Sequence, residues 1–130
     1  MNKKQWLGLG LVTVAAIGLA ACGNRASRKD SSDAKTDLKA AIVTDTGGVD
    51  DKSFNQSAWE GLQAWGKENG LSKDNGFTYF QSTSEADFAN NFSQAATNGY
   101  KLVYGVGYKL APAVTAAADE NADINYVIID

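Results

Sequence analysis

The stretch KAAIVTDTGGVDDKSFNQ, residues 39–56, contains the change of pattern that decides the fold. It opens with a short apolar run from Lys39 to Thr44, which is typical of a buried β-strand. A turn with two adjacent glycines follows. An apolar face then begins at Phe54 and continues through Ala58, Gly61, Leu62 and Trp65. Spacings of three and four residues mark one face of a helix, so the stretch predicts a strand, a long loop and a helix.

The same alternation continues toward the C-terminus. The further predicted elements are a strand at 77–81, a helix between an N-cap at Ser84 and a stop at Gly99, a strand at 101–106, an Ala-rich helix with Pro112 near its first position, and a strand at 126–129. Strands that alternate with helices imply right-handed crossovers and a parallel sheet with helices on both faces. The expected fold class is α/β.

Composition and charge exclude several classes of protein. The 130 residues are 44% hydrophobic and 21% charged, which indicates at most one globular domain with appendages. The chain has no His and a single Cys, so Cys/His zinc sites, histidine acid–base catalysis and an intramolecular disulfide are excluded. The formal net charge of −3 lacks the basic surplus of a nucleic-acid binder. We expect no nucleic acid, metal or cofactor among the partners.

The first residues have the form of an export signal. Lys3 and Lys4 precede an uncharged apolar run at 6–21, which is short for a membrane-spanning helix of about 20 residues. Leu19-Ala20-Ala21-Cys22 resembles the lipobox of bacterial lipoproteins, which implies cleavage behind Ala21 and acylation of Cys22. The alternative is an uncleaved anchor with an incidental cysteine.

The residues that follow Cys22 predict a flexible tether. Residues 23–37 contain no large apolar side chain, so they cannot bury a core. We therefore divide the chain into a lipoprotein signal peptide at 1–21, an acylated Cys with its tether at 22–37, and a globular part at 38–130.

The candidate ligand site lies where the predicted strands end, because open parallel sheets bind ligands beyond the carboxyl ends of their strands. These ends carry Asp45, Gln81-Ser82, the turn Gly105-Val106-Gly107, and Asp130. The loop after the first strand adds Asp50 and Asp51, with only Lys52 to offset the carboxylates. Such a loop suits neutral hydroxyls better than phosphate.

An aromatic ring beside these carboxylates suggests a ligand class. Carboxylates accept hydrogen bonds from vicinal diols, and Phe54 offers a face on which a flat ring can stack. A diol joined to a flat ring describes a nucleoside. A simpler interpretation is that Asp50 and Asp51 favour the positive end of the helix and that Phe54 belongs to the core. The spacing of Ser53 and Gln56 predicts a capping box at this helix.

The string from Val43 to Gln56, continued through Trp59-Glu60-Gly61, closely resembles the basic membrane protein (BMP) family of substrate-binding lipoproteins, and within it the PnrA-like purine nucleoside receptors of ABC importers. The resemblance implies the N-terminal lobe of a two-lobed type I periplasmic-binding-protein fold. It also implies a monomeric receptor without catalysis, held on the extracytoplasmic face of the cell membrane by lipid on Cys22. Such a receptor passes a purine nucleoside to a membrane permease.

The resemblance also implies roles for individual residues. Asp45 would bond the nucleoside, Phe54 would stack on its base, and Asp130 would hold the ribose hydroxyls. The same pocket would be lined by Asn55, Asp51, Gly105 and Gly107. Members of the family continue into a second lobe with an opposing aromatic, so residues 38–130 would be an incomplete lobe carrying half of a site.

Three alternatives stay open. A sugar receptor of the same fold also uses an aromatic ring and carboxylates. Gly48-Val49-Asp50-Asp51 resembles the end of the D-x-D-x-G-x-D-D motif of calcium-dependent nucleoside hydrolases, although Thr44 and Thr46 stand where two carboxylates should be. The third alternative is a surface lipoprotein without a small-molecule ligand.

Overall fold

The protein, seen in a computed structural model that describes residues 36–130, alternates strands with helices. In chain order the elements are β1 (Ala40–Val43), α1 (Phe54–Glu68), β2 (Phe77–Phe80), η1 (Glu85–Asp87), α2 (Phe88–Thr97), β3 (Leu102–Val106), η2 (Tyr108–Leu110), α3 (Ala111–Glu120) and β4 (Asn125–Ile129). Each strand and helix predicted for the globular part is confirmed. The signal peptide and Cys22, with the tether up to residue 35, lie outside the described residues.

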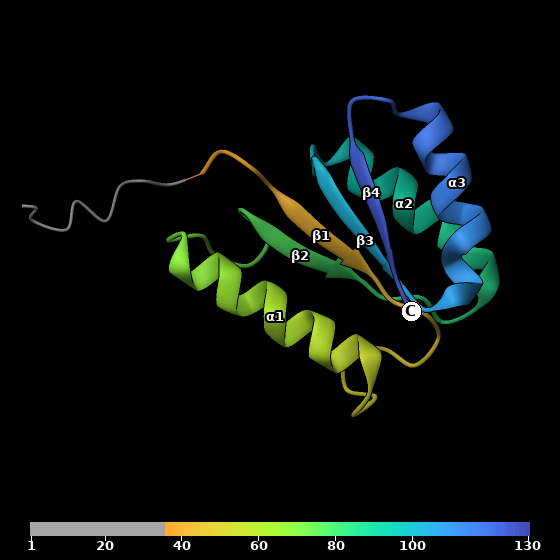
Figure 1. Ribbon diagram of the computed structural model, residues 1–130, viewed down its shortest axis with the longest axis horizontal. Helices are drawn as coiled ribbons and strands as arrows, with labels where there is room; N and C mark the ends of the chain where they lie inside the picture. The colour runs from red at the N-terminus through yellow and green to blue at the C-terminus, as the bar shows by residue number, and fades with distance from the viewer. Residues whose placement is uncertain (1–35) are drawn as a thin grey trace, which may run out of the picture. The chain divides into compact units, whose positions relative to one another are not determined.

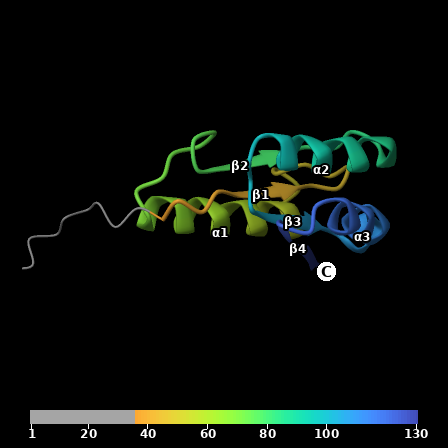
Figure 2. The same cartoon turned by 90° about the horizontal axis from the view of Figure 1, so that it is seen from above.

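The strands form one parallel sheet in the order β2-β1-β3-β4 (Figure 2). From β1 the chain moves outward to β2, and from β2 it crosses back past β1 to β3. The carboxyl ends of β1 and β3 are therefore neighbours from which the chain departs in opposite directions. This arrangement is the topological switch point at which open α/β sheets bind ligands.

The helices cover both faces of the sheet, as the sequence predicts. Figure 1 shows α1 on one side of the sheet and α2 with α3 on the other. Side chains of β1 alternate between two cores: Ile42 packs with Leu62 and Phe77 beneath α1, whereas Val43 packs with Phe92 beneath α2. All four residues of β1 are buried, as expected for a central parallel strand. Among the described residues, no helix combines the length and hydropathy needed to cross a bilayer.

The predicted start and stop of α2 are both confirmed. Ser84 and Asp87 form a reciprocal capping box at η1, which leads directly into α2. At the other end Gly99 has φ +79, and the amide N–H groups of Gly99 and Tyr100 bond the carbonyls of Ala96 and Ala95. This pair of bonds is a Schellman motif, which needs a residue with positive φ after the helix.

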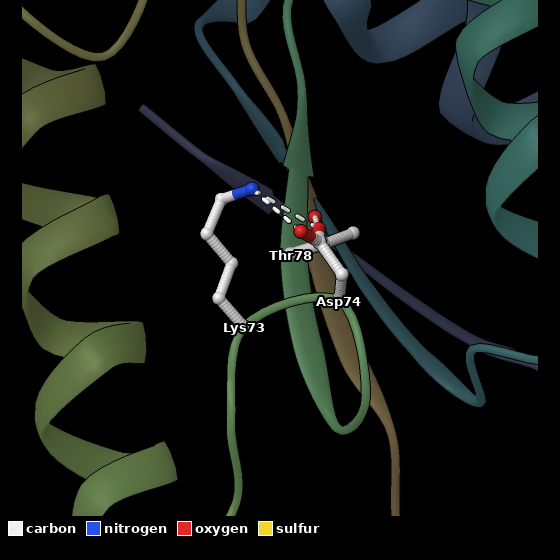
Figure 3. A network of polar contacts seen from close by, with 3 residues as sticks. All are labelled: Lys73, Asp74 and Thr78. Atoms are coloured by element: carbon white, nitrogen blue, oxygen red, sulfur yellow. Dashed lines mark hydrogen bonds and ion pairs between the residues drawn. The ribbon is translucent and has the colours of Figure 1, made fainter.

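A polar network lies at the end of the sheet opposite the switch point. Figure 3 shows the side chains of Lys73 and Thr78 at the carboxylate of Asp74. The Asp74 carboxylate accepts hydrogen bonds from Thr78 Oγ1 at 2.7 Å and from Lys73 Nζ at 2.9 Å. These bonds lower the pKa of Asp74. They close the turn that enters β2 at its amino end, so the network belongs to the scaffold and lies away from the candidate ligand site.

Candidate binding site

Asp45 is the first predicted site residue along the chain and follows β1 by two positions. Its Oδ1 accepts hydrogen bonds from the Gly47 amide at 2.8 Å and from Asn55 Nδ2 at 2.6 Å. No donor among residues 36–130 bonds its other oxygen, Oδ2, and the side chain is partly exposed. One carboxylate oxygen is thus fixed by the loop, and the other is free to accept a hydrogen bond from a ligand.

Asp51 caps the N-terminus of α1. Its Oδ1 accepts the amide N–H groups of Ser53 at 2.8 Å and Gln56 at 3.1 Å. Its Oδ2 accepts the Asn55 amide at 3.3 Å and Asn55 Nδ2 at 2.9 Å. Burial raises the pKa of Asp51, but these hydrogen bonds outweigh it and lower the pKa overall. Four donors use both oxygens of Asp51 to hold the loop.

The predicted capping box of Ser53 and Gln56 is therefore wrong. The Ser53 side chain makes no capping hydrogen bond, and Gln56 Nε2 donates instead to Glu60 Oε1 at 2.8 Å. A carboxylate beside the positive end of a helix makes stronger, charge-assisted bonds than a hydroxyl does. Asp51, two residues before Ser53, accepts hydrogen bonds from the free amide N–H groups at the start of α1, which is the role predicted for the Ser53 side chain.

Asn55 links the two carboxylates. Its side-chain amide nitrogen donates to both Asp45 and Asp51, and the residue is only 1% exposed. The carbonyl oxygen of the same side chain is buried and has no hydrogen-bond partner among the described residues. Because a single NH₂ group satisfies both acids, Asn55 holds Asp45 at a fixed place relative to the start of α1.

Phe54 begins α1 with its ring in solvent. Its side chain is 61% exposed, although phenylalanine is among the residues most often buried. The interpretation of Phe54 as a core residue is therefore wrong, and the core beneath α1 is built from Leu62 and Phe77 instead. An exposed aromatic in the residue before Asn55, whose side chain bonds Asp45, can stack on a flat ligand.

The ends of β3 and β4 come to the same edge of the sheet. A Cβ added to Gly107 would lie 3.4 Å from Asp45 Oδ2, so the chain after β3 passes directly beside the free carboxylate oxygen. The Gly107 amide donates to the Ile129 carbonyl at 2.8 Å, which joins the end of β3 to the end of β4. Asp130 follows Ile129 and is exposed. The structure thus brings Asp45, Gly107 and Asp130 to one edge.

Gly105 is placed differently from Gly107. It lies within β3, where an added Cβ would come within 2.8 Å of Val114 and 3.0 Å of Phe92. These neighbours belong to α3 and α2, so the absence of a side chain at Gly105 lets the helices pack closely on the sheet. The end of the strand explains why two glycines two residues apart differ: Gly105 lies within β3 and faces the core, while Gly107 lies past the strand end, where its φ of +104 turns the chain away.

Two further residues lie near this edge: Tyr108, to which the sequence assigns no role, and Gln81, which the sequence places at a strand end without a role. Tyr108 follows Gly107 and is 66% exposed, so it presents a second aromatic near the end of β3. Tyr104 and Tyr108 are four residues apart, a spacing typical of one helix face, but Tyr104 lies in β3. Gln81 follows β2, and its amide would lie 2.7 Å from a Cβ on Gly48, so it packs over the glycine turn.

A buried chain of hydrogen bonds fixes the backbone at Thr44 and Asp45. Ser82 Oγ donates to the Thr44 carbonyl at 2.7 Å and accepts from Asn91 Nδ2 at 3.0 Å. Thr44 Oγ1 in turn donates to the Asp45 carbonyl at 2.8 Å. Thr44 and Ser82 are fully buried, so these bonds tie the end of β1 to β2 and α2.

The donor set of this edge does not suit a metal ion. Among residues 36–130 no group of three or more His, Cys, Asp or Glu side chains could hold one. Asp51, which the hydrolase motif would need, directs both oxygens to N–H groups. The edge instead offers one free carboxylate oxygen, an exposed carboxylate at Asp130 and exposed aromatic rings, which can recognise hydroxyls and a flat ring.

The fold and the candidate site together define an α/β unit with carboxylates and exposed aromatic rings at the switch point of a parallel sheet. Residues 38–130 match the family described as ABC transporter substrate-binding protein PnrA-like (Bmp). The chain belongs to this family, as the sequence predicts.

Three relatives are similar over most of the chain. The ABC transporter nucleoside-binding protein BmpA of Lactococcus lactis is 50% identical over 129 residues, which are 98% of this chain and 37% of the relative. The CD4+ T-cell-stimulating antigen of Listeria monocytogenes is 46% identical over 134 residues, covering 100% of this chain and 38% of the relative. Basic membrane protein B of Borreliella burgdorferi is 31% identical over 120 residues, covering 92% and 34%. The chain thus spans less than two fifths of the length of these relatives.

Two solved structures share the fold. A lipoprotein fragment from Peptoclostridium difficile superposes with a TM-score of 0.61 at 20% identity and covers 72% of this chain and 73% of its own. A solute-binding protein of an ABC transporter system from Conexibacter woesei gives a TM-score of 0.55 at 21% identity, covering 68% and 28%. At these identities the likeness concerns the fold alone, and it confirms the predicted α/β class.

Proposed function

We propose that this chain is the N-terminal lobe of a receptor that captures nucleosides, purine nucleosides in particular, for an ABC transporter and catalyses no reaction. The observation that carries the proposal is the free Oδ2 of Asp45 on the same edge as the exposed ring of Phe54. The name of the lactococcal relative, an ABC transporter nucleoside-binding protein, supports it. A second lobe, which the resemblance to this family implies, would close over the ligand and complete its burial.

Each site residue has a distinct task in this proposal. Asp45 Oδ2 and the carboxylate of Asp130 accept hydrogen bonds from ribose hydroxyls, and Phe54 stacks on the base. Gly107 leaves room for the ligand at Asp45, because a side chain there would occupy the space in contact with the free oxygen. Asn55 keeps Asp45 in place through a direct hydrogen bond. Asp51 acts indirectly: it bonds the same Asn55 amide, and its own oxygens are occupied by the start of α1.

The proposal includes attachment to a membrane. The predicted signal at 1–21 would be removed, Cys22 would carry lipid, and the tether at 22–37 would hold a monomeric lobe at the extracytoplasmic face of the cell membrane beside its permease. A flexible tether of this length has a root-mean-square reach of about 20 Å. The relatives named as basic membrane proteins support this location.

An NMR titration of the purified protein tests the ligand class. We expect inosine and guanosine to shift the ¹⁵N-¹H signals of the loop around Asp45 and Phe54 and of the chain end at Asp130, with weaker effects from ribose. Equal shifts with glucose would favour a sugar receptor, shifts with Ca²⁺ would favour the hydrolase, and no shift with any nucleoside would contradict the proposal. Cytidine tests the preference for purines.

A pair of variants with equal charge sharpens this test. Asp45→Asn keeps the acceptor for the Gly47 amide but replaces the free carboxylate, so the nucleoside-induced shifts should require about tenfold more ligand or more. Asp50→Asn removes the same charge from an exposed position of the same loop and should leave the titration unchanged. If both variants behave alike, net charge rather than a specific contact governs binding.

A further inference from the structure

Each helix among the described residues begins at the edge of the sheet that carries the candidate site. α1 follows β1, η1 with α2 follows β2, and η2 with α3 follows β3. The start of a helix attracts phosphate, because its free N–H groups point outward and the helix dipole favours negative charge. The edge therefore has three places at which an anion could be held, and the side chains around them bear on ligand choice.

Two of the three helix starts carry a carboxylate of the chain itself. Asp51 accepts three backbone N–H groups at the start of α1, at 2.8, 3.1 and 3.3 Å. Asp87 Oδ2 accepts the amide N–H groups of Thr83 and Ser84, both at 2.9 Å, directly before η1. Hydrogen bonds from Thr83 and Ser84 also lower the pKa of Asp87, so this carboxylate is ionised at neutral pH. A phosphate that approached either start would meet a fixed negative charge.

The third helix start has no such carboxylate on its own segment. No side chain caps η2, and Gly107, which precedes it, lies beside Asp45 Oδ2. Lys109 adds a positive charge on η2 itself. Its Nζ donates to Glu85 Oε1 at 2.9 Å, which links η2 to η1 across the edge. Glu85 thus brings a negative charge to the third start as well.

The ion pair of Glu85 and Lys109 acts on the charge of the edge more than on stability. Glu85 raises the pKa of Lys109 most, and Asp45 adds a smaller increase, so the lysine lies within electrostatic range of the candidate site. The two side chains are 63% and 52% exposed, and such exposed pairs contribute little to stability. Replacing Glu85 should therefore leave the fold intact while it gives the edge an unbalanced positive charge.

We propose that Glu85 is a specificity-determining residue, which pairs with Lys109 so that the edge accepts nucleosides and rejects their phosphate esters. The inference rests on the proposed function, since it concerns the nucleoside held at Asp45. A phosphate at this edge would lose part of its hydration and gain no unpaired cation in return. A nucleotide would first have to be hydrolysed: water breaks the P–O bond and gives inorganic phosphate and the nucleoside, which the receptor then binds.

An NMR titration of the purified protein with inosine and with inosine 5′-monophosphate, at low salt, tests the inference. The monophosphate should require about tenfold more ligand or more to shift the signals of the loop around Asp45 and Phe54. In Glu85→Gln the ratio of the two affinities should move about two- to fivefold toward the monophosphate, because Lys109 is released. The preference for inosine should also shrink at about 1 M salt, where charges interact only over about 3 Å.

Asp123→Asn is the matched control. It removes the same charge and releases Lys101 from another exposed ion pair, but Lys101 precedes β3 and lies at the opposite end of the sheet. This variant should leave the ratio of affinities unchanged.

The possible failures are distinguishable. Equal affinity of the unaltered protein for the two ligands, equal changes in Glu85→Gln and Asp123→Asn, or a preference that salt does not alter would each overturn the inference and leave the proposed function standing. An absence of shifts with inosine as well as with the monophosphate would overturn the proposed function, and the inference with it.

Discussion

At the scale of single residues, Asp45 divides its two oxygens between two tasks. Oδ1 is held by Gly47 and Asn55, and Oδ2 stays available beside Gly107. A carboxylate that is already oriented loses little conformational freedom when a ligand binds, and this preorganisation improves affinity. The buried amide of Asn55 is the part that makes the orientation possible, because it satisfies two acids that would otherwise repel each other.

The cap at α1 gives the first prediction. Asp51→Ala removes the acceptor for the amide groups of Ser53, Asn55 and Gln56, so the free energy of unfolding should fall by about 1–2 kcal/mol, the usual cost of losing an N-cap. Urea denaturation followed by circular dichroism measures it. Asp51→Asn, which keeps an acceptor oxygen, should lose less, and an unchanged unfolding midpoint in Asp51→Ala would show that water replaces the cap.

The exposed ring of Phe54 gives the second prediction. Phe54→Ala should change the free energy of unfolding by less than about 0.5 kcal/mol, because the side chain is mostly in solvent. Nucleoside affinity should fall about tenfold or more, since stacking on an aromatic ring contributes about 1–3 kcal/mol. Phe54→Trp keeps a stacking face and serves as the control in the NMR titration. Equal affinity for all three proteins would remove Phe54 from the site.

At the scale of elements, α1 contains a matched pair of substitutions, which is the third prediction. Gly61→Ala should raise the free energy of unfolding by about 1 kcal/mol, because alanine is the better helix former and the added methyl group meets no atom. Gly66→Ala should lower it by about 1–3 kcal/mol, because the methyl group would collide with the buried Phe77 ring. Thermal and urea unfolding of the two variants should move in opposite directions, and a shared direction would contradict this packing.

Local sequence pattern is enough to predict the elements but not every contact between them. Apolar runs, the Gly99 stop and the Ser84 cap are short-range signals, and each is confirmed. The start of α1 is different, because Ser53 and Asp51 can both accept its free amide groups and only the folded loop shows that the carboxylate does so.

The candidate site depends on strand order, which no local pattern contains. Asp45 and Asp130 are recognisable because each follows an apolar strand. Their meeting at one edge requires that β3 lie between β1 and β4, and this follows only from the crossovers of the whole sheet. The exposure of Tyr108 likewise depends on how the chain turns after β3.

At the scale of the whole molecule, the paired charges give the fourth prediction. Hydrogen bonds or ion pairs lower the pKa values of Asp51, Asp74, Asp87 and Asp123 below 3.8. A lowered pKa in the folded state stabilises the protein above the unfolded value, and this stabilisation disappears as the pH falls through the folded value. Lys73 and Lys109 have pKa values raised above 10.5 by Asp74 and Glu85, so their contribution is present below 10.5 and disappears at higher pH.

The measurement is the midpoint of urea unfolding as a function of pH. Because the sequence has no His, we expect a nearly constant midpoint between about pH 5 and 9, a fall below about pH 4 and a smaller fall above about pH 10.5. Asp87→Asn should weaken the acid dependence, since Thr83 and Ser84 bond that carboxylate. A sharp loss of stability near pH 6 would contradict this distribution of charges.

The complete burial of β1 has a consequence for how such proteins diversify. The strand consists of four small or branched apolar residues, and the proposed recognition site begins only after it, at Asp45 in the following turn. In the proposed receptor, stability and ligand preference are therefore encoded at neighbouring but separate positions. Directed evolution of positions 45, 54 and 130 should change which small molecule is captured without disturbing the sheet, so one scaffold can yield a panel of receptors that differ only along their rim.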